Sequence, residues 1–382
     1  MNESTTGTLA NARYTRVKLW PRGPFHFGKR GVGLNETEIA MPADSFFSAL
    51  CNAIHGLQGT AAVAEFIARF PSADRTEQAP PLRITSLMPF VEPGAGLTPI
   101  YLLPMPLLHI PIGKDPIGQR KQMKQIQWVS HAIFAQIISG HSLLTAPDKA
   151  ELLENAHDEV RAKPRTVQQG SVWLSRSEYN SLHDPETRFW SVGIRPRVAV
   201  DRITGASAVY SSGSVNFAKN AGLYLYIEWL AGVDVAVRQQ VQAAITYLGD
   251  SGIGGERTYG YGQYSASFED LQEMPIQQPS NATHVTTLSP FLPKPSERTV
   301  LMGDARYEII LRRGWLTLPG YSNLRRPTVR MVDVGAILST ESGVAPQGYL
   351  ANATPQPLQN TAYTIHRYGL CWPVAVVPQF VH

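Results

Sequence analysis

A glycine-rich stretch at residues 252–262, GIGGERTYGYG, is the sharpest concentration of residues that could do chemistry. Five glycines in eleven residues let the backbone adopt positive φ and approach a bulky anion, which exposed N–H groups can then bind. Arginine adds charge, and two tyrosines offer ring faces for base stacking. A tight turn is the alternative, but two glycines would suffice for it. We therefore predict nucleic-acid contacts from Gly252, Gly254, Gly255, Arg257, Thr258, Tyr259, Gly260, Tyr261 and Gly262.

This stretch does not match the common nucleotide-binding loops. No Gly-Lys-Ser/Thr ends it, as a P-loop requires, and it follows a predicted helix rather than a strand, which also excludes a Rossmann loop. The ten histidines are scattered, and no HExxH, CxxC or GxSxG sequence occurs. We therefore expect no metal, no cofactor and no catalytic residue. If the backbone binds phosphates, Gly254→Val should abolish binding with only a modest loss of stability.

A second segment, PFHFGKR at residues 24–30, places aromatic and basic residues close together. Phe25, His26, Lys29 and Arg30 are therefore candidates for a nucleic-acid groove. The alternative is that the phenylalanines belong to the core and that His26 is incidental. As an acid–base catalyst His26 is disfavoured, because no paired base or oxyanion donor is recognisable in the sequence.

Charge is weakly positive in total but unevenly distributed. The chain of 382 residues has a formal net charge of +4, with 17% charged residues. Basic runs occupy residues 114–124, 188–202 and 309–332. A charge run is usually a solvated face. Three basic runs in a chain of such small net charge imply, however, that basic and acidic residues lie on different parts of the surface, which favours a polyanionic partner. From the second run we predict contacts by Arg195, Arg197 and Arg202.

Composition excludes several other classes. Two distant cysteines make neither a disulfide framework nor a metal site, which favours the cytoplasm. No stretch approaches the ~18 apolar residues that a membrane span needs. The first residues are polar and lack the apolar core of a signal peptide.

Hydrophobic periodicity predicts an α+β fold in the order βαββαβ, the ferredoxin-like scaffold of RRM-type RNA-binding domains. Asp234 should cap the second helix and Gly249 should end it. We expect an RRM-like domain at 1–270 with a large insertion at about 92–221, a linker at 271–296 and a smaller β-rich, RRM-like domain at 297–382. The expected elements are strands at 13–20, 82–91, 222–230, 263–268 and 305–316, a strand pair within 362–380, and helices at 44–55, 60–70, 234–248 and, within the insertion, an acidic one near 148–162.

Several stretches resemble a known family. GIGGERTYGYGQY resembles the glycine-rich loop of RAMP proteins, the RNA-binding superfamily of CRISPR systems, in which it lies between the second helix and the fourth strand. The sequence is also similar to subunit four of the Csm complex, a type III-A CRISPR effector, over most of its length. The stretches that carry this likeness are PADSFFSALCNAI, YLLPMPLL, QIQWVSHAIFAQIISG, RPRVAVDRITGASAVYSSGSVNF, YEIILRRGWL and IHRYGLCWPVAV.

The resemblance implies a non-catalytic subunit that binds the 5′ tag of the CRISPR RNA. Such a subunit lies beside the large polymerase-like subunit and the first backbone RAMP subunit. It also implies an RNA contact at Ser45 in the first helix, and a protruding hairpin after RPRVAVDR that wedges between tag and guide.

Two other hypotheses remain open. One is a RAMP-type endoribonuclease that cuts CRISPR precursor RNA with a histidine such as His26. The other is a structural scaffold whose basic patches bind protein. In addition, we expect the tail to dock on a partner through Arg312, Arg313 and Trp315, because arginine and tryptophan are favoured interface anchors.

Overall fold

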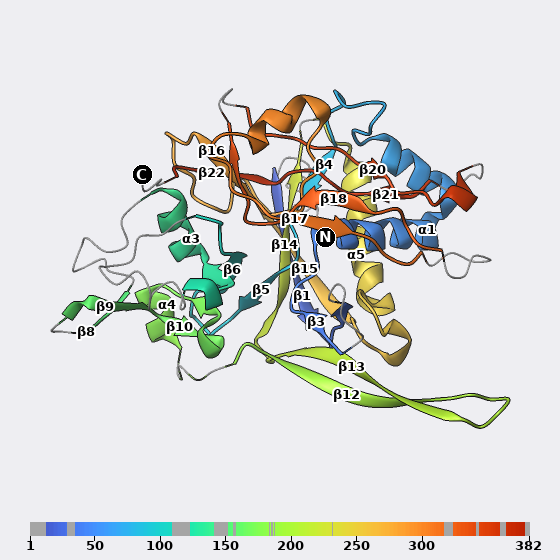
Figure 1. Ribbon diagram of the computed structural model, residues 1–382, viewed down its shortest axis with the longest axis horizontal. Coiled ribbons are helices and arrows are strands. Elements are labelled where there is room, and N and C mark those ends of the chain that lie inside the picture. The colour runs from blue at the N-terminus through green and yellow to red at the C-terminus, as the bar shows by residue number, and fades with distance from the viewer. Residues whose placement is uncertain are drawn as a thin grey trace, which may run out of the picture.

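The structure is a computed structural model. It describes residues 13–28, 35–108, 123–140, 152–155, 158–182, 184, 186, 188–230, 232–316, 324–340, 344–359 and 364–378. Helices α1 (Ala43–Ala68) and α5 (Val235–Ser251) lie on one side of a central sheet and α3 (His131–Ile138) lies on the other (Figure 1). The described chain also contains a short helix α4 (Arg176–Ser181) and the 3₁₀ helices η1 (Gln168–Gly170), η2 (Arg257–Tyr259), η3 (Pro295–Leu301) and η4 (Gln356–Leu358).

The centre of the sheet has the predicted ferredoxin-like topology. Strand β1 pairs antiparallel with both β14 and β15, and β14 pairs antiparallel with β4 and β5. The predicted strand at 82–91 is divided into β4 and β5. Within the described residues, nine strands make up this sheet: β1 (Tyr14–Pro21), β4 (Leu82–Ile84), β5 (Met88–Val91), β6 (Ile100–Pro104), β7 (Trp128–Ser130), β10 (Thr166–Val167), β11 (Val172–Trp173), β14 (Ala221–Trp229) and β15 (Tyr264–Leu271).

The two helices of this core follow the sequence pattern. Helix α1 covers both predicted helices, with a break in helical geometry at Gly59, and it buries Phe46, Phe47 and Leu50 against the sheet. Helix α5 begins after Asp234, whose side chain accepts from the Ala236 N–H. The sequence predicts that this helix ends at Gly249, but it continues to Ser251. Gly249 lies instead where the helix passes close to the backbone of β15.

The segment at 92–221 adds strands to the same sheet and one long hairpin. Strands β6, β7, β11 and β10 extend the sheet beyond β5. The hairpin of β12 (Trp190–Val200) and β13 (Ser207–Phe217) projects away from the body of the molecule (Figure 1). The prediction of an acidic helix near 148–162 is wrong, because that region holds a second hairpin, β8 (Leu152–Asn155) with β9 (Asp158–Pro164).

The sheet face opposite α1 and α5 is also covered. In many RRM domains aromatic residues of this face stack on RNA bases. Here Tyr224 and Tyr226 are fully buried in a cluster with α3 and with Trp372. Trp372 belongs to the carboxyl-terminal part, by which we mean the chain that follows β15. Burial, reinforced by the Arg16 charge, lowers the pKa of His131 beside them to about 3, so this histidine is neutral. Ligand contacts must therefore be sought elsewhere.

The carboxyl-terminal part is built from small sheets that pack against the ferredoxin-like core. The segment at 271–296, predicted as a linker, contains β16, the central strand of a three-stranded sheet. Tyr368 packs against Phe47 of α1. The remaining strands are β16 (His284–Thr287), β19 (Ile337–Ser339) and β22 (Pro373–Val376), then the pairs β17 (Ile309–Arg312) with β18 (Val329–Val332), β20 (Ala351–Asn352) with β21 (His366–Arg367), and, near the amino terminus, β2 (Phe27–Gly28) with β3 (Thr37–Glu38).

Candidate functional site

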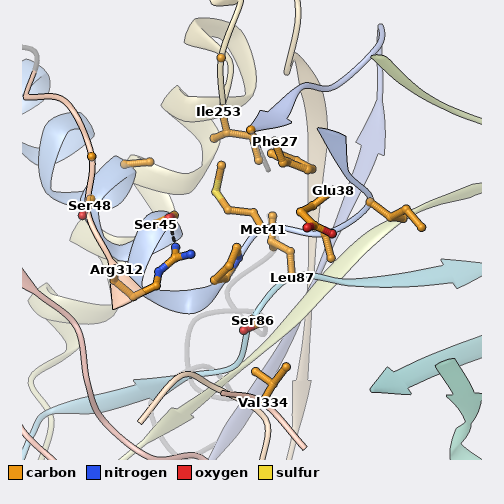
Figure 2. A pocket seen from close by; sticks show the side chains of 18 of the residues that line it. Phe27, Glu38, Met41, Ser45, Ser48, Ser86, Leu87, Ile253, Arg312 and Val334 are labelled. Atoms are coloured by element: carbon orange, nitrogen blue, oxygen red, sulfur yellow. Dashed lines mark hydrogen bonds between the residues drawn. The ribbon is translucent and has the colours of Figure 1, made fainter. Parts of the chain in front are cut away.

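A cleft of about 790 Å³ opens between α1, the glycine-rich loop and the carboxyl-terminal part. Figure 2 shows Ser45 and Ser48 of α1, Ile253 of the loop and Arg312 of β17 around it. Apolar side chains such as Met41 and Leu87 also line it. Its charged lining consists of two acids, Glu38 and Asp333, and of the five arginines Arg257, Arg312, Arg313, Arg326 and Arg367.

One wall of the cleft is held by a buried ion-pair cluster. Asp44, in the first turn of α1, is completely buried. Arg312 donates to Asp44 from Nε at 2.9 Å and to the Ser45 hydroxyl from Nη2 at 2.8 Å. Arg367 donates to the same carboxylate. Arg312, which the sequence predicts as an anchor for another protein, is thus already bound by Asp44 of its own chain. Docking of the tail on a partner stays a prediction. Arg313 and Trp315 remain exposed.

A third arginine, Arg326, completes this wall. Its Nη1 donates to the Ser48 hydroxyl at 3.1 Å. Burial, together with the nearby charge of Arg367, lowers the pKa of Arg326 to about 10. Arg326 is still charged at neutral pH, but in a place that disfavours its charge.

The glycine-rich loop uses part of its backbone to hold its own shape. The N–H of Gly255 donates to the His26 carbonyl at 2.9 Å, and that of Gly262 donates to the Pro24 carbonyl at 2.8 Å. Gly254 has φ of +85°, and a Cβ there would meet the His26 carbonyl oxygen and lie 3.0 Å from the Phe27 ring. Close packing within the chain therefore accounts for Gly254 and Gly255. The sequence interpretation, that these two glycines leave space for a ligand, misses this contact.

The tip of the loop is its accessible part. Arg257, Thr258, Tyr259 and Gly260 are exposed, whereas Gly252, Tyr261 and Gly262 are buried. Tyr259 is 61% exposed and Tyr261 is 1% exposed, so only the first ring is open to a stacking partner in this conformation. Gly252 also lines the cleft.

The hairpin meets the loop tip through Arg197. The Arg197 guanidinium lies 4.0 Å from the centroid of the Tyr259 ring and 3.5 Å from a carboxylate oxygen of Glu256. Arg195, two residues before Arg197 on β12, and Arg202, in the turn of the hairpin, are exposed. The protruding hairpin implied by the resemblance is thus present, and RPRVAVDR forms most of its first strand and the beginning of its turn.

The two faces of the hairpin differ. Alternate residues of a strand share a face, so Arg195 and Arg197 lie on one side of β12. The even-numbered residues of β12 form the other side. Its apolar side chains Val192, Ile194, Val198 and Val200 are each more than half exposed.

The remaining predicted residues have mixed outcomes. Phe25 is fully buried in the core, and its ring packs against Phe27 and Phe217. His26 is 4% exposed, and its Nδ1 lies 2.8 Å from the Gly213 carbonyl oxygen. Phe25 and His26 thus support the loop from behind and do not face solvent. Lys29 and Arg30 lie outside the described residues. Ser45 lines the cleft.

Sequence reasoning missed Asp44, Arg326 and Arg367 as parts of the site. The basic run at 309–332 contains Arg326 and could have indicated it. Nothing in the local sequence indicates Arg367 or its partner Asp44, which is 323 residues away. No cluster of His, Cys, Asp or Glu that could hold a metal ion is found in the described parts of the chain. None of the described helices is long and apolar enough to cross a membrane.

The two tyrosines of the loop should respond differently to truncation. Tyr259→Ala should cost about 0.5–1 kcal/mol of folding free energy, because it removes an exposed contact with Arg197. If the ring stacks on a base, the same change should weaken RNA binding by about 1–3 kcal/mol. Tyr261→Ala should lower the free energy of unfolding by about 3–5 kcal/mol, because it empties a buried site. Urea unfolding and RNA titration of both variants check this; equal stability losses would contradict it.

The fold and the loop together define a RAMP-type protein: a ferredoxin-like core with a glycine-rich loop between its second helix and fourth strand. More closely, the chain is similar to Csm4 proteins of CRISPR systems over most of its length, and its carboxyl-terminal part matches their family model. Residues 280–376 match the family model of the CRISPR Csm4 C-terminal domain.

Two relatives and two solved structures illustrate the likeness. "CRISPR system Cms protein Csm4" of Thermococcus onnurineus (strain NA1) is 24% identical over 95% of this chain and 97% of its own. The protein of the same name from Mycobacterium tuberculosis (strain CDC 1551 / Oshkosh) is 24% identical over 82% of this chain and 84% of its own. A Csm3-Csm4 subcomplex of the type III-A CRISPR-Cas interference complex gives a TM-score of 0.60 at 15% identity, covering 96% of this chain and 99% of the other. A Csm1-Csm4 cassette in complex with cA4 gives 0.54 at 18% identity with the same coverage. These two structures share the fold.

Proposed function

We propose that this chain is a non-catalytic subunit that holds the 5′ tag of a CRISPR RNA in the cleft. The observation that carries the proposal is the cleft itself, in which five arginines oppose two acids between α1, the glycine-rich loop and the carboxyl-terminal part. Arginine is suited to phosphate because its planar fork donates two parallel hydrogen bonds. The apolar part of the lining suits the bases that accompany those phosphates.

The exposed loop tip extends this interface toward the hairpin. Arg257 connects the cleft with the tip, and Tyr259 offers an exposed ring beside Arg197. A positively charged groove with aromatic platforms is the usual way in which proteins bind single-stranded nucleic acid. The RNA then runs from the cleft over the tip to the hairpin, whose exposed apolar face provides the wedge between tag and guide.

The proposal includes two protein partners. Solved relatives are complexes of Csm4 with Csm1 and of Csm4 with Csm3. By analogy, the large polymerase-like subunit and the first backbone RAMP subunit flank this chain in a cytoplasmic effector complex.

The nuclease alternative depends on His26 and is not favoured. A general base must reach the 2′-hydroxyl that it activates, but His26 is almost entirely buried. Its Cδ2 lies close enough to Gly255 that a Cβ there would be 2.7 Å away.

Purification of the assembled complex tests the proposed function. The RNA that copurifies should share one fixed 5′ sequence, because a tag-holding subunit selects that end. Sequencing of the 5′ ends is the measurement, and a complex reconstituted with the charge-reduced variant Arg257→Ala/Arg313→Ala should retain less RNA. Random 5′ ends, or a complex free of RNA, would overturn the proposal.

A further inference from the structure

The ion-pair cluster on the cleft wall carries more positive than negative charge. Arg312, Arg326 and Arg367 surround the single carboxylate of Asp44. Asp333 also lies on the wall and interacts electrostatically with Arg312, but among the described residues none of these three arginines donates a hydrogen bond to it. Even with Asp333 counted, three arginines face two carboxylates. A buried charge without a partner is costly, so buried cations are normally paired. The cluster is therefore incomplete as it stands.

Hydrogen-bond donors in the cluster are also unused. The Nε of Arg367 and the Nε of Arg326 are buried and have no hydrogen-bond partner within the described part of the chain. Arg367 is 2% exposed and lines the cleft. Buried donors in native proteins are nearly always satisfied, so an unsatisfied pair beside a cavity suggests a missing acceptor.

We propose that this cluster is a phosphate-binding site, and that its ligand is one phosphate of the RNA backbone. An anion with several acceptor oxygens would satisfy the unused donors and balance the excess charge at once. The assignment to RNA rests on the proposed function, because the cluster forms one wall of the cleft that the RNA occupies. A free phosphate would offer the same chemistry, and the experiment below separates the two sources.

The site is composite. Asp44, Ser45 and Ser48 come from α1, and the three arginines come from the carboxyl-terminal part. A phosphate bound here therefore stabilises the packing of the carboxyl-terminal part on the ferredoxin-like core. Its binding is visible as a rise in thermal stability as well as in RNA affinity.

Arg326→Gln is the informative variant, because Arg326 is the arginine that is not bound to Asp44. The matched control is Arg298→Gln, which removes one exposed charge from η3, outside the cleft. Without phosphate, Arg326→Gln should melt at the same temperature as the parent protein or higher, because its charge is disfavoured in the folded chain. A lower melting temperature would show that Arg326 stabilises the folded chain without a ligand, and this would overturn the inference.

Inorganic phosphate is the first probe, with chloride at equal ionic strength as reference. Phosphate should raise the melting temperature of the parent protein and of Arg298→Gln more than that of Arg326→Gln. Arg326→Gln should show only the general stabilisation that an excluded salt gives to any protein. Equal gains in all three proteins would overturn the site.

A single-stranded RNA carrying the tag sequence is the second probe. Arg326→Gln should bind it roughly tenfold more weakly, with a salt slope lower by about one, while Arg298→Gln should match the parent. If Arg326→Gln loses the phosphate effect but binds RNA normally, the ligand is not an RNA phosphate. If the parent protein binds no RNA, the proposed function fails, and the phosphate experiment still decides the site.

Discussion

Replacing Asp44 by alanine should destabilise the protein by about 3–5 kcal/mol, because it leaves buried guanidinium groups without their counter-charge. The carboxylate is fully buried and binds both Arg312 and Arg367. It also lies in the first turn of α1, where a negative charge is favourable. Urea unfolding of the full chain measures the loss as a change in midpoint at constant slope.

An exposed ion pair of the same chemistry provides the control. Asp250 pairs with Arg22 at 2.7 Å, and both side chains are largely accessible to solvent. Asp250→Ala should therefore cost at most about 1 kcal/mol. Adding Arg326→Gln to Asp44→Ala should recover part of the loss, because it removes one of the charges left unpaired. If Asp44→Ala is no more harmful than Asp250→Ala, the buried cluster does not hold the two parts of the chain together.

The elements that the sequence predicts well are those with strong local periodicity. In β14, Leu223, Leu225 and Ile227 alternate with Tyr224 and Tyr226, and the structure buries the two sets on opposite faces of the sheet. The order of strands and helices around them was enough to predict the ferredoxin-like topology. Local patterns carried this information because each element buries one face in a fixed period.

The errors come from features that depend on distant parts of the chain. The residues near 148–162 contain good helix formers, but they pair as a hairpin, and intrinsic propensity is only a weak prior. The sequence predicts Arg312 as an interface anchor because arginine is favoured at interfaces, and nothing near it in sequence indicates a partner within the chain. Its partner, Asp44, lies 268 residues away. The cleft wall is made of such contacts, so its existence could not be predicted from spacing.

The glycine-rich loop shows the same limit in a single residue. A glycine predicts that something lies close to the backbone, but not whether that neighbour is a ligand or the chain itself. For Gly254 the neighbour is the carbonyl of His26, contributed by the segment after the first strand. The loop and that segment form one unit, and the exposed tip that they support remains the part accessible to a ligand.

Gly254→Val should therefore be among the most damaging substitutions in the chain. Gly254 has φ of +85°, which costs an L-residue about 1–2 kcal/mol. The new side chain would also meet the His26 carbonyl and the Phe27 ring, and such overpacking costs about 1–3 kcal/mol. We expect a total loss of about 2–5 kcal/mol, with RNA binding lost because the loop no longer keeps its shape. This replaces the modest loss of stability predicted from the sequence.

Gly260→Ala is the control, because it separates backbone strain from steric conflict. Gly260 has a similar φ of +79°, but no atom lies within 4 Å of the position that a Cβ would take. It should lose only the 1–2 kcal/mol of the strained backbone. Thermal or urea unfolding of both variants gives the difference directly. If Gly254→Val remains as stable as Gly260→Ala and loses only its affinity for RNA, the backbone at Gly254 faces the RNA rather than His26.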